Sequence, residues 1–222
     1  MDIESNIKQF QNYLRSYNCR LVAVSKTKPN SDILKAYEAG QRIYGENKAQ
    51  ELAAKSEQLP KDIEWHMIGH LQRNKVKYIA PFVDLIHSID SLRLLNEVEK
   101  QGEKNERVIN CLLQVFIADE ETKFGLDESE VIQLVNDPAV PTLKHVKIVG
   151  LMGMATFTDN KDKIRNEFKK LKSIFDTIAA LDLPVNVEMR ELSMGMSGDY
   201  TIAIEEGSTL IRVGSSIFGQ RN

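Results

Sequence analysis

The sequence has few cysteines and no long run of apolar residues. Its 222 residues include only Cys19 and Cys111, whose spacing matches no metal-binding or redox motif. We therefore expect two free thiols of a reducing compartment. No apolar stretch approaches the roughly 18 residues of a membrane-spanning helix, and the amino terminus lacks a signal-peptide pattern. These absences predict a soluble cytoplasmic protein with no membrane partner.

Several catalytic and binding signatures are absent as well. The net charge of −3 argues against nucleic acid as a partner, because phosphate backbones need a concentrated positive surface. No Ser-His-Asp arrangement, Walker loop or dinucleotide fingerprint occurs. His66 and His70 are four residues apart, but the zincin pattern needs a Glu after the first His and a helix. We expect hydrogen-bonded histidines instead, with His70 at the rim of a pocket and no metal site.

The chain does contain short apolar runs that alternate with helical segments. A leading helix is expected over residues 3–15, where apolar residues recur at helical spacing. A helix with Ser31 as its candidate N-cap follows the first strand. The expected strands are 21–26, 42–44, 64–69, 85–89, 108–117, 146–152, 191–194 and 209–213.

Strict alternation of strands and helices predicts a parallel sheet. Eight units in 222 residues fit an α/β fold, a (β/α)8 TIM barrel with little room for insertions. An open doubly wound sheet is the alternative, although it would usually use fewer strands at this length. No linker interrupts the pattern, so we expect a single domain over residues 1–222.

Lys26 ends the first expected strand and is the leading candidate for a reactive residue. Alternation places Val22, Val24 and Lys26 on one face. Burial disfavours an ammonium ion, which lowers the pKa of the amine and makes it a nucleophile toward aldehydes. The alternative is a lysine that extends to the rim or protects a strand end from aggregation.

Two loops rich in small residues follow the last two strands, at 193–199 and 212–216. Barrels of this class often bind phosphate there, at the start of a short helix. Ser197, Gly214 and Ser215 are the candidate phosphate ligands, although Ser197 as a plain N-cap and Gly214 as a turn glycine are the alternatives.

An amine and a phosphate site on one barrel fit an aldehyde that carries a phosphate, and pyridoxal 5′-phosphate has both groups. Arg212 could reach its pyridine nitrogen and leave it unprotonated, because a guanidinium keeps its proton. Asn47 could hydrogen-bond the ring or its phenolic oxygen. A barrel that binds another sugar or phosphate ester is the alternative.

Seven blocks of the sequence, in this order along nearly the whole chain, resemble the pyridoxal phosphate homeostasis protein family. They are AVSKTKP (23–29), YGEN (44–47), WHMIGHLQRNK (65–75), HSID (87–90), GLMGM (150–154), LSMGMS (192–197) and IRVG (211–214). The resemblance implies a single-domain barrel related to the amino-terminal domain of alanine racemase, a type III pyridoxal phosphate fold. It also implies that Lys26 carries the cofactor as a Schiff base, that the Ser197 and Gly214-Ser215 loops hold the phosphate, and that Arg212 faces the ring nitrogen.

The family has no established catalytic activity and is thought to buffer or deliver the cofactor, with apoenzymes as possible acceptors. The resemblance therefore implies a non-enzymatic homeostasis protein. A weak pyridoxal phosphate-dependent amino-acid racemase is the alternative, but racemisation needs acid/base groups on both faces of the amino acid, and only Lys26 is evident. Because the sequence ends at Asn222, just after the eighth unit, we expect no second domain and a monomer.

Overall fold

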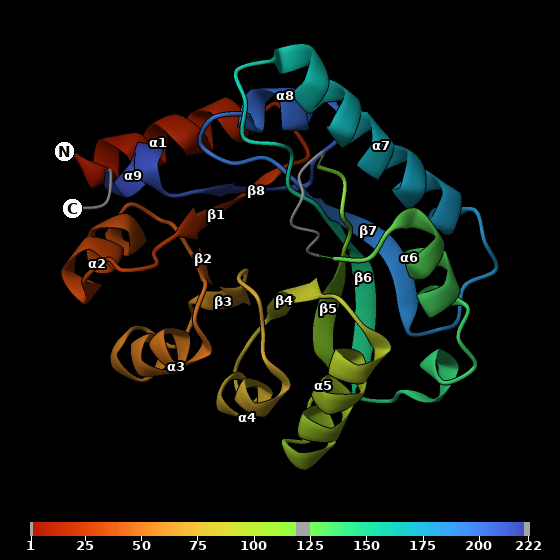
Figure 1. The fold of residues 1–222 in the computed structure, drawn as a ribbon. Helices are drawn as coiled ribbons and strands as arrows, with labels where there is room; N and C mark the ends of the chain where they lie inside the picture. Colours follow the sequence, from red (N-terminus) through yellow and green to blue (C-terminus); the bar gives the residue numbers. More distant parts are fainter. Residues whose placement is uncertain (1, 119–124, 220–222) are drawn as a thin grey trace.

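A closed barrel of parallel strands forms the centre of the computed structural model, which describes residues 2–118 and 125–219. Each strand pairs with the next, and β8 pairs with β1 to close the sheet (Figure 1). The (β/α)8 barrel is confirmed, and an open doubly wound sheet is wrong. The strands are β1 (Arg20–Val24), β2 (Ile43–Glu46), β3 (Glu64–Met67), β4 (Leu85–Ile89), β5 (Ile109–Gln114), β6 (Val146–Met152), β7 (Val187–Ser193) and β8 (Leu210–Val213).

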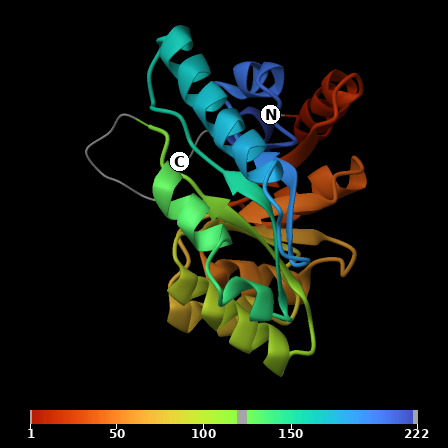
Figure 2. The ribbon, with the colours of Figure 1, turned by 90° about the vertical axis from the view of Figure 1, so that its right-hand side faces the viewer.

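Helices surround the barrel (Figures 1 and 2). The leading helix α1 lies beside the last helix α9, where Asn6 Nδ2 donates a hydrogen bond to the Ile217 carbonyl at 3.0 Å. No helix in the described ranges combines the length and apolar character needed to cross a membrane. The helices are α1 (Ile3–Leu14), α2 (Asn30–Glu38), α3 (Ala49–Gln58), α4 (Val76–Ile79), α5 (Leu92–Lys104), α6 (Glu128–Val135), α7 (Lys161–Ala179), α8 (Tyr200–Glu205) and α9 (Ser215–Phe218), with short 3-10 turns at Arg73–Lys75 and Val140–Thr142.

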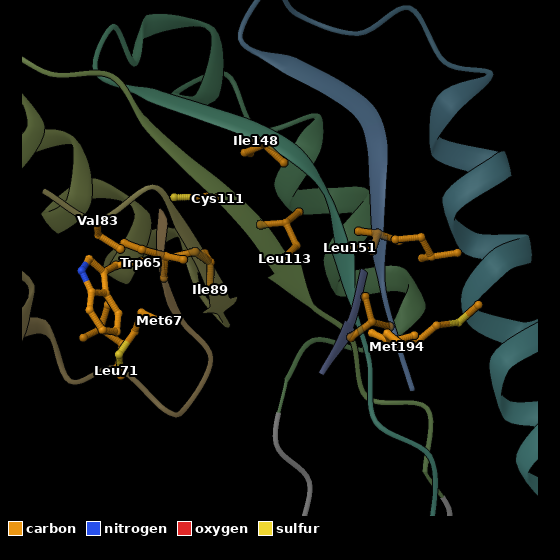
Figure 3. Packing of buried hydrophobic residues seen from close by; sticks show 14 of the residues in the cluster. Trp65, Met67, Leu71, Val83, Ile89, Cys111, Leu113, Ile148, Leu151 and Met194 are labelled. Carbon is orange, nitrogen blue, oxygen red and sulfur yellow. The ribbon is translucent and has the colours of Figure 1, made fainter. Parts of the chain in front are cut away.

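The apolar core has two layers, one on each face of the sheet, because successive side chains of a strand point to opposite faces. The layer between the strands and the helices is the larger, and Figure 3 shows part of it around Trp65 and Met194. The layer inside the barrel consists of Val22, Ile43, Leu85, Leu112, Val149, Met152 and Leu210. Residues that continue the inward alternation past a strand end therefore face the mouth of the barrel.

Strand β1 ends at Val24, two residues before the expected end. The Ser25 N–H donates to the Gly45 carbonyl on β2 at 3.1 Å, but the Lys28 N–H turns back to the Ser25 carbonyl at 3.0 Å. Lys26 is a central residue of this turn, and its backbone lies outside the sheet. Lys26 is therefore on a tight turn beyond the strand rather than within it.

Other boundaries also differ from the sequence expectation; for example, β3 ends at Met67 and β5 at Gln114 rather than at residues 69 and 117. Helix α2 begins at Asn30 after Pro29, with no side-chain cap, so Ser31 lies inside the helix and its assignment as N-cap is wrong. Strand β7 begins at Val187 rather than at residue 191, because it pairs along β6 through an irregularity in register. Gly150 marks this irregularity: a Cβ there would lie 1.8 Å from the Glu191 carbonyl oxygen, so only glycine fits.

Candidate functional site

A cavity of about 550 Å³ opens at the carboxyl ends of the strands. The segments that follow β1, β2, β6, β7 and β8 contribute most of its lining. We call it the Lys26 cavity. All six residues predicted to bind a cofactor line it: Lys26, Asn47, Ser197, Arg212, Gly214 and Ser215. The fold thus brings together residues that are far apart in the sequence.

Lys26 follows β1, and its side chain continues the inward side of that strand. Val22 belongs to the layer inside the barrel and Val24 lines the cavity, so the predicted alternation continues to Lys26. The side chain is half-buried rather than buried. Thr27, the next residue, has a φ of 64°, a value that β-branched residues rarely adopt. The turn is therefore held in an unfavourable conformation by its surroundings.

Asn47 reaches the cavity from the loop between β2 and α3. Gly69, just after β3, packs directly on its backbone, and a Cβ there would lie 2.4 Å from the Asn47 carbonyl oxygen. The Gly69 carbonyl in turn accepts a hydrogen bond from Ser88 Oγ at 2.6 Å. Asn47 can therefore lie where it does only because residue 69 is a glycine.

The two small-residue loops meet in this cavity and present backbone donors to it. Ser197 and Gly198 come from the β7–α8 loop, and Gly214 and Ser215 follow β8. The backbone N–H groups of Ser197, Gly198 and Ser215 have no acceptor within residues 2–118 and 125–219. Converging N–H groups of this kind form a ready site for an anion such as phosphate.

Arg212 is buried at the cavity and links the ends of three strands. Its Nη1 donates to both the carbonyl and the Oγ of Ser193 on β7, and its Nη2 donates to the Gly153 carbonyl after β6 at 3.0 Å. Burial lowers the pKa of the guanidinium to about 10, so it stays charged at neutral pH. The Nε–H and one N–H of Nη2 have no acceptor among the described residues and remain available to a ligand.

A buried hydrogen-bonded chain extends from Arg212 into the barrel. His87 Nδ1 lies 3.0 Å from Ser193 Oγ, and His87 Nε2 lies 3.0 Å from His66 Nδ1. Ser193 Oγ accepts from Arg212, and two directions satisfy the other contacts: Ser193 donates to His87, which donates to His66, or His66 donates to His87, which donates to Ser193. Burial lowers the pKa of His66 to about 3 and that of His87 well below 6.5, so both rings are neutral.

This chain makes the stability of the protein sensitive to mild acid. The unfolded chain protonates His66 below pH 6.5, whereas the folded chain does so only near pH 3, so the folded state loses stability across that window. Between pH 7 and pH 5 we expect His66 to lower the free energy of unfolding by about 2 kcal/mol, with His87 acting in the same direction. Urea unfolding at both pH values measures this loss.

The variant His66→Asn tests this assignment. Between pH 7 and pH 5 it should show a pH slope flatter by about one proton than that of the parent protein. Equal slopes in the parent protein and His66→Asn would show that His66 is protonated in the folded state.

The segment between β6 and α7 forms another wall of the Lys26 cavity. The Thr156 N–H and Oγ donate to the carboxylate of Glu167 on α7 at 2.7 and 2.6 Å, which ties the segment to that helix. Met154 and Phe157 give this side an apolar character, and Phe157 is 98% exposed. The titratable lining residues are Lys26, Lys28, Asp159, Asp199 and Arg212; no described histidine, cysteine or tyrosine lines the cavity.

The two histidines singled out in the sequence, His66 and His70, lie outside this cavity. His70 is 62% exposed, with its Nδ1 3.6 Å from Asp90 Oδ2, and borders a different surface pocket, so its placement at the rim of this site is wrong. Met196 lines the Lys26 cavity, whereas Met152 and Met194 are buried in the two apolar layers. Reasoning from the sequence did not identify His87 and Ser193 as part of this region. The polar pair His87-Ser88 within the apolar run 85–89 was a signal for His87.

Comparison with known proteins gives a consistent result. The family model for the N-terminal domain of alanine racemase matches residues 2–222. A pyridoxal phosphate homeostasis protein from Aquifex aeolicus is 41% identical over 209 residues, which cover 93% of this chain and 90% of that protein. A mouse protein of the same name is 38% identical over 216 residues, or 91% of this chain and 77% of that protein.

Solved structures show the same barrel. PipY from Synechococcus elongatus, with pyridoxal phosphate bound, has a TM-score of 0.86 at 32% identity and covers 98% of this chain and 100% of its own. Its form without pyridoxal phosphate has a TM-score of 0.89. An alanine racemase from Bartonella henselae is 15% identical, with a TM-score of 0.72 over 99% of this chain and 58% of its own, so that likeness concerns the fold alone.

Proposed function

Since the chain belongs to the pyridoxal phosphate homeostasis protein family, we propose that it binds pyridoxal 5′-phosphate in the Lys26 cavity and holds it as a Schiff base on Lys26. One observation carries the proposal: a primary amine, three backbone N–H groups without an acceptor among the described residues and a partly unpaired guanidinium share one cavity. In the covalent step, the neutral Lys26 amine adds to the aldehyde carbon and the aldehyde oxygen leaves as water.

The residues of the cavity suit the parts of this cofactor. The N–H groups of Ser197, Gly198 and Ser215 are donors for the phosphate, with the hydroxyls of Ser197 and Ser215 and the backbone of Gly214 beside them. The remaining donors of Arg212 suit the ring nitrogen, which they would leave unprotonated. Asn47, which follows β2, can hydrogen-bond the phenolic oxygen. When bound, the cofactor supplies an aldehyde that a second amine can take over by exchange.

We propose that this exchange serves storage and delivery of the cofactor rather than a reaction on an amino acid. A racemase needs acid/base groups on both faces of its substrate. The described lining offers Lys26, Lys28 and the carboxyl groups of Asp159 and Asp199, but no tyrosine, histidine or cysteine. A guanidinium that keeps its proton also weakens the cofactor as an electron sink. Apoenzymes that require the cofactor are the acceptors that fit this role.

Titration of the purified protein with pyridoxal phosphate, followed by borohydride reduction, tests the binding proposal. We expect a saturable yellow complex and a phosphopyridoxyl group on the peptide that contains Lys26. Pyridoxal, which lacks the phosphate, should bind at least about 100-fold more weakly, because charge-assisted hydrogen bonds contribute about 1.5–3 kcal/mol each. Equal affinity for both compounds would contradict the phosphate site.

A separate assay distinguishes delivery from racemase activity. The loaded protein is incubated with alanine and serine in heavy water, and deuterium at the α-carbon is measured against the same concentration of free pyridoxal phosphate. We expect no exchange above that background. Robust exchange that disappears with Lys26→Ala would favour a racemase instead.

The proposed assembly is a single-domain monomer over residues 1–222, which acts in the cytoplasm. The closed sheet leaves no open edge for a second chain to extend. Cys19 and Cys111 are both buried free thiols, which fits a reducing compartment. Sedimentation equilibrium of the loaded protein tests the monomer, and a dimer mass would contradict it.

A further inference from the structure

A buried cluster of charged residues lies behind the turn that carries Lys26. Lys55 on α3 contacts Glu46 at the end of β2 and Glu51 one helical turn earlier, both at 2.7 Å. Its Nζ also donates to the Ser25 carbonyl at 2.8 Å. The side chains of Lys55, Glu46 and Glu51 are 9%, 0% and 24% exposed. We call these three residues the Lys55 cluster.

The cluster forms hydrogen bonds with the chain on both sides of Lys26. Before it, Ser25 donates from its Oγ to Glu46 at 2.6 Å and accepts from Lys55 through its carbonyl. After it, the Thr27 N–H donates to Glu51 Oε1 at 2.7 Å. The unfavourable backbone conformation of Thr27 is thus stabilised by a carboxylate that accepts a hydrogen bond from its N–H. Glu51 therefore fixes the conformation of the turn directly.

As a link between α3 and the sheet, the cluster has a high desolvation free energy. Buried ion pairs often contribute no more to stability than apolar residues of the same volume, because desolvation offsets the attraction. Among the described residues Glu46 Oε2 has no hydrogen-bond partner, and burial raises the pKa of this carboxyl. A purely structural contact between α3 and β2 would also not require an acceptor for the Thr27 N–H. The geometry is better explained by a need to hold residues 25–27 in place.

We propose that Glu51 and Lys55 are positioning residues that fix the turn at residues 25–27 and thereby aim the Lys26 amine into the cavity. This inference rests on the proposed function, because it gives a purpose to the position of Lys26. Neither residue lines the cavity, so their effect on the cofactor is transmitted through the backbone of the turn. Displacement of a reacting group by about 1 Å can slow a reaction by about 100-fold.

The test compares Glu51→Met, which removes the acceptor of the Thr27 N–H, with Glu51→Gln, which keeps an acceptor oxygen. In the cofactor-free protein, we expect amide exchange at Thr27 to be at least about 10-fold faster in Glu51→Met than in the parent protein. Glu51→Gln should remain within about threefold of it. Borohydride trapping at Lys26 with pyridoxal phosphate should be about 10-fold slower in Glu51→Met and restored in Glu51→Gln.

Glu4→Met is the matched control, because Glu4 and Lys8 form an exposed acid–lysine pair at the same i,i+4 spacing on α1. It should change neither readout. Lys55→Met is a second variant that should also speed amide exchange at Thr27. In Lys55→Met the buried Glu46 would lose the cation that pairs with it. If this single variant does not fold, the double variant Glu46→Gln/Lys55→Met is used instead.

The outcomes separate this inference from the proposed function. If the parent protein gives no adduct on Lys26, the proposed function fails, and amide exchange alone decides whether the cluster fixes the turn. If the parent protein gives the adduct but Glu51→Met matches it in both readouts, the positioning role is wrong. An equal slowing in Glu51→Gln and Glu51→Met would also overturn it, because a positioning acceptor is preserved in the former.

Discussion

Lys26→Ala should abolish the borohydride-stable pyridoxyl adduct and leave the barrel folded. The side chain is half-buried at the mouth and takes no part in either apolar layer, so its loss removes little packing. We expect the free energy of unfolding to change by less than about 1 kcal/mol. Mass spectrometry of the reduced protein and a thermal melt followed by circular dichroism measure the two effects.

Lys28 provides the control for this prediction within the same turn. It also lines the Lys26 cavity, but its Nζ donates to the Phe218 carbonyl at 3.0 Å, which directs it toward α9. Lys28→Ala should therefore keep the adduct on Lys26. An adduct of undiminished yield on Lys28 in the Lys26→Ala protein would contradict the assignment of the reactive amine, and loss of folding in that variant would make Lys26 a structural residue.

Arg212→Met should both destabilise the barrel and weaken cofactor binding. The substitution leaves Ser193 Oγ and the Gly153 carbonyl without their donor, at a cost of about 1–3 kcal/mol for each buried group. For a protein of this size, a loss of about 3 kcal/mol corresponds to a fall in Tm of roughly 6–12 °C. The affinity for pyridoxal phosphate should fall about 10- to 100-fold, since a charge-assisted hydrogen bond is lost.

Arg20 is a suitable comparison because it also links two strands, at the opposite end of the barrel. Its Nη2 lies 2.6 Å from Glu191 Oε1, but the side chain is half-exposed. Exposed ion pairs contribute about 0–1 kcal/mol, so Arg20→Met should lower Tm only slightly and leave cofactor affinity unchanged. Comparable losses in the two variants would show that the position of Arg212 at the cavity is irrelevant.

The architecture could be predicted from the sequence because its signals are local. Short apolar runs and amphipathic helices alternate, which predicts a parallel sheet, and the count of eight units favours a barrel over an open sheet. The boundaries were less accurate where tertiary pairing decides them. Residues 187–190 alternate polar and apolar side chains and were not recognised as strand, yet pairing with β6 extends β7 through them. Lys26 lies beyond its strand because backbone hydrogen bonds of Ser25 and Lys28 turn the chain there.

The cavity residues were found because the barrel topology assigns the carboxyl ends of the strands to a site. Their supporting contacts were not found, because they join side chains from distant segments. Ser193 and His87 are 106 residues apart, and no pattern in the sequence links them. The same holds for the contact between Lys55 and Ser25. A lysine at helical spacing from Glu51 looks like an ordinary surface pair, and only the fold shows that it is buried.

The pairing of β1 with β8 links the completion of the proposed site to the closure of the barrel. Lys26 follows the first strand, whereas Arg212 belongs to the last and Gly214 follows it, and Val22 pairs with Arg212 across this seam. The proposed cofactor site is therefore complete only when β8 is paired with β1. A ligand that bridges the seam favours the closed barrel by mass action, by about 2.7 kcal/mol at 100 times its Kd. Pyridoxal phosphate bound in the proposed site would thus stabilise the pairing of β1 with β8.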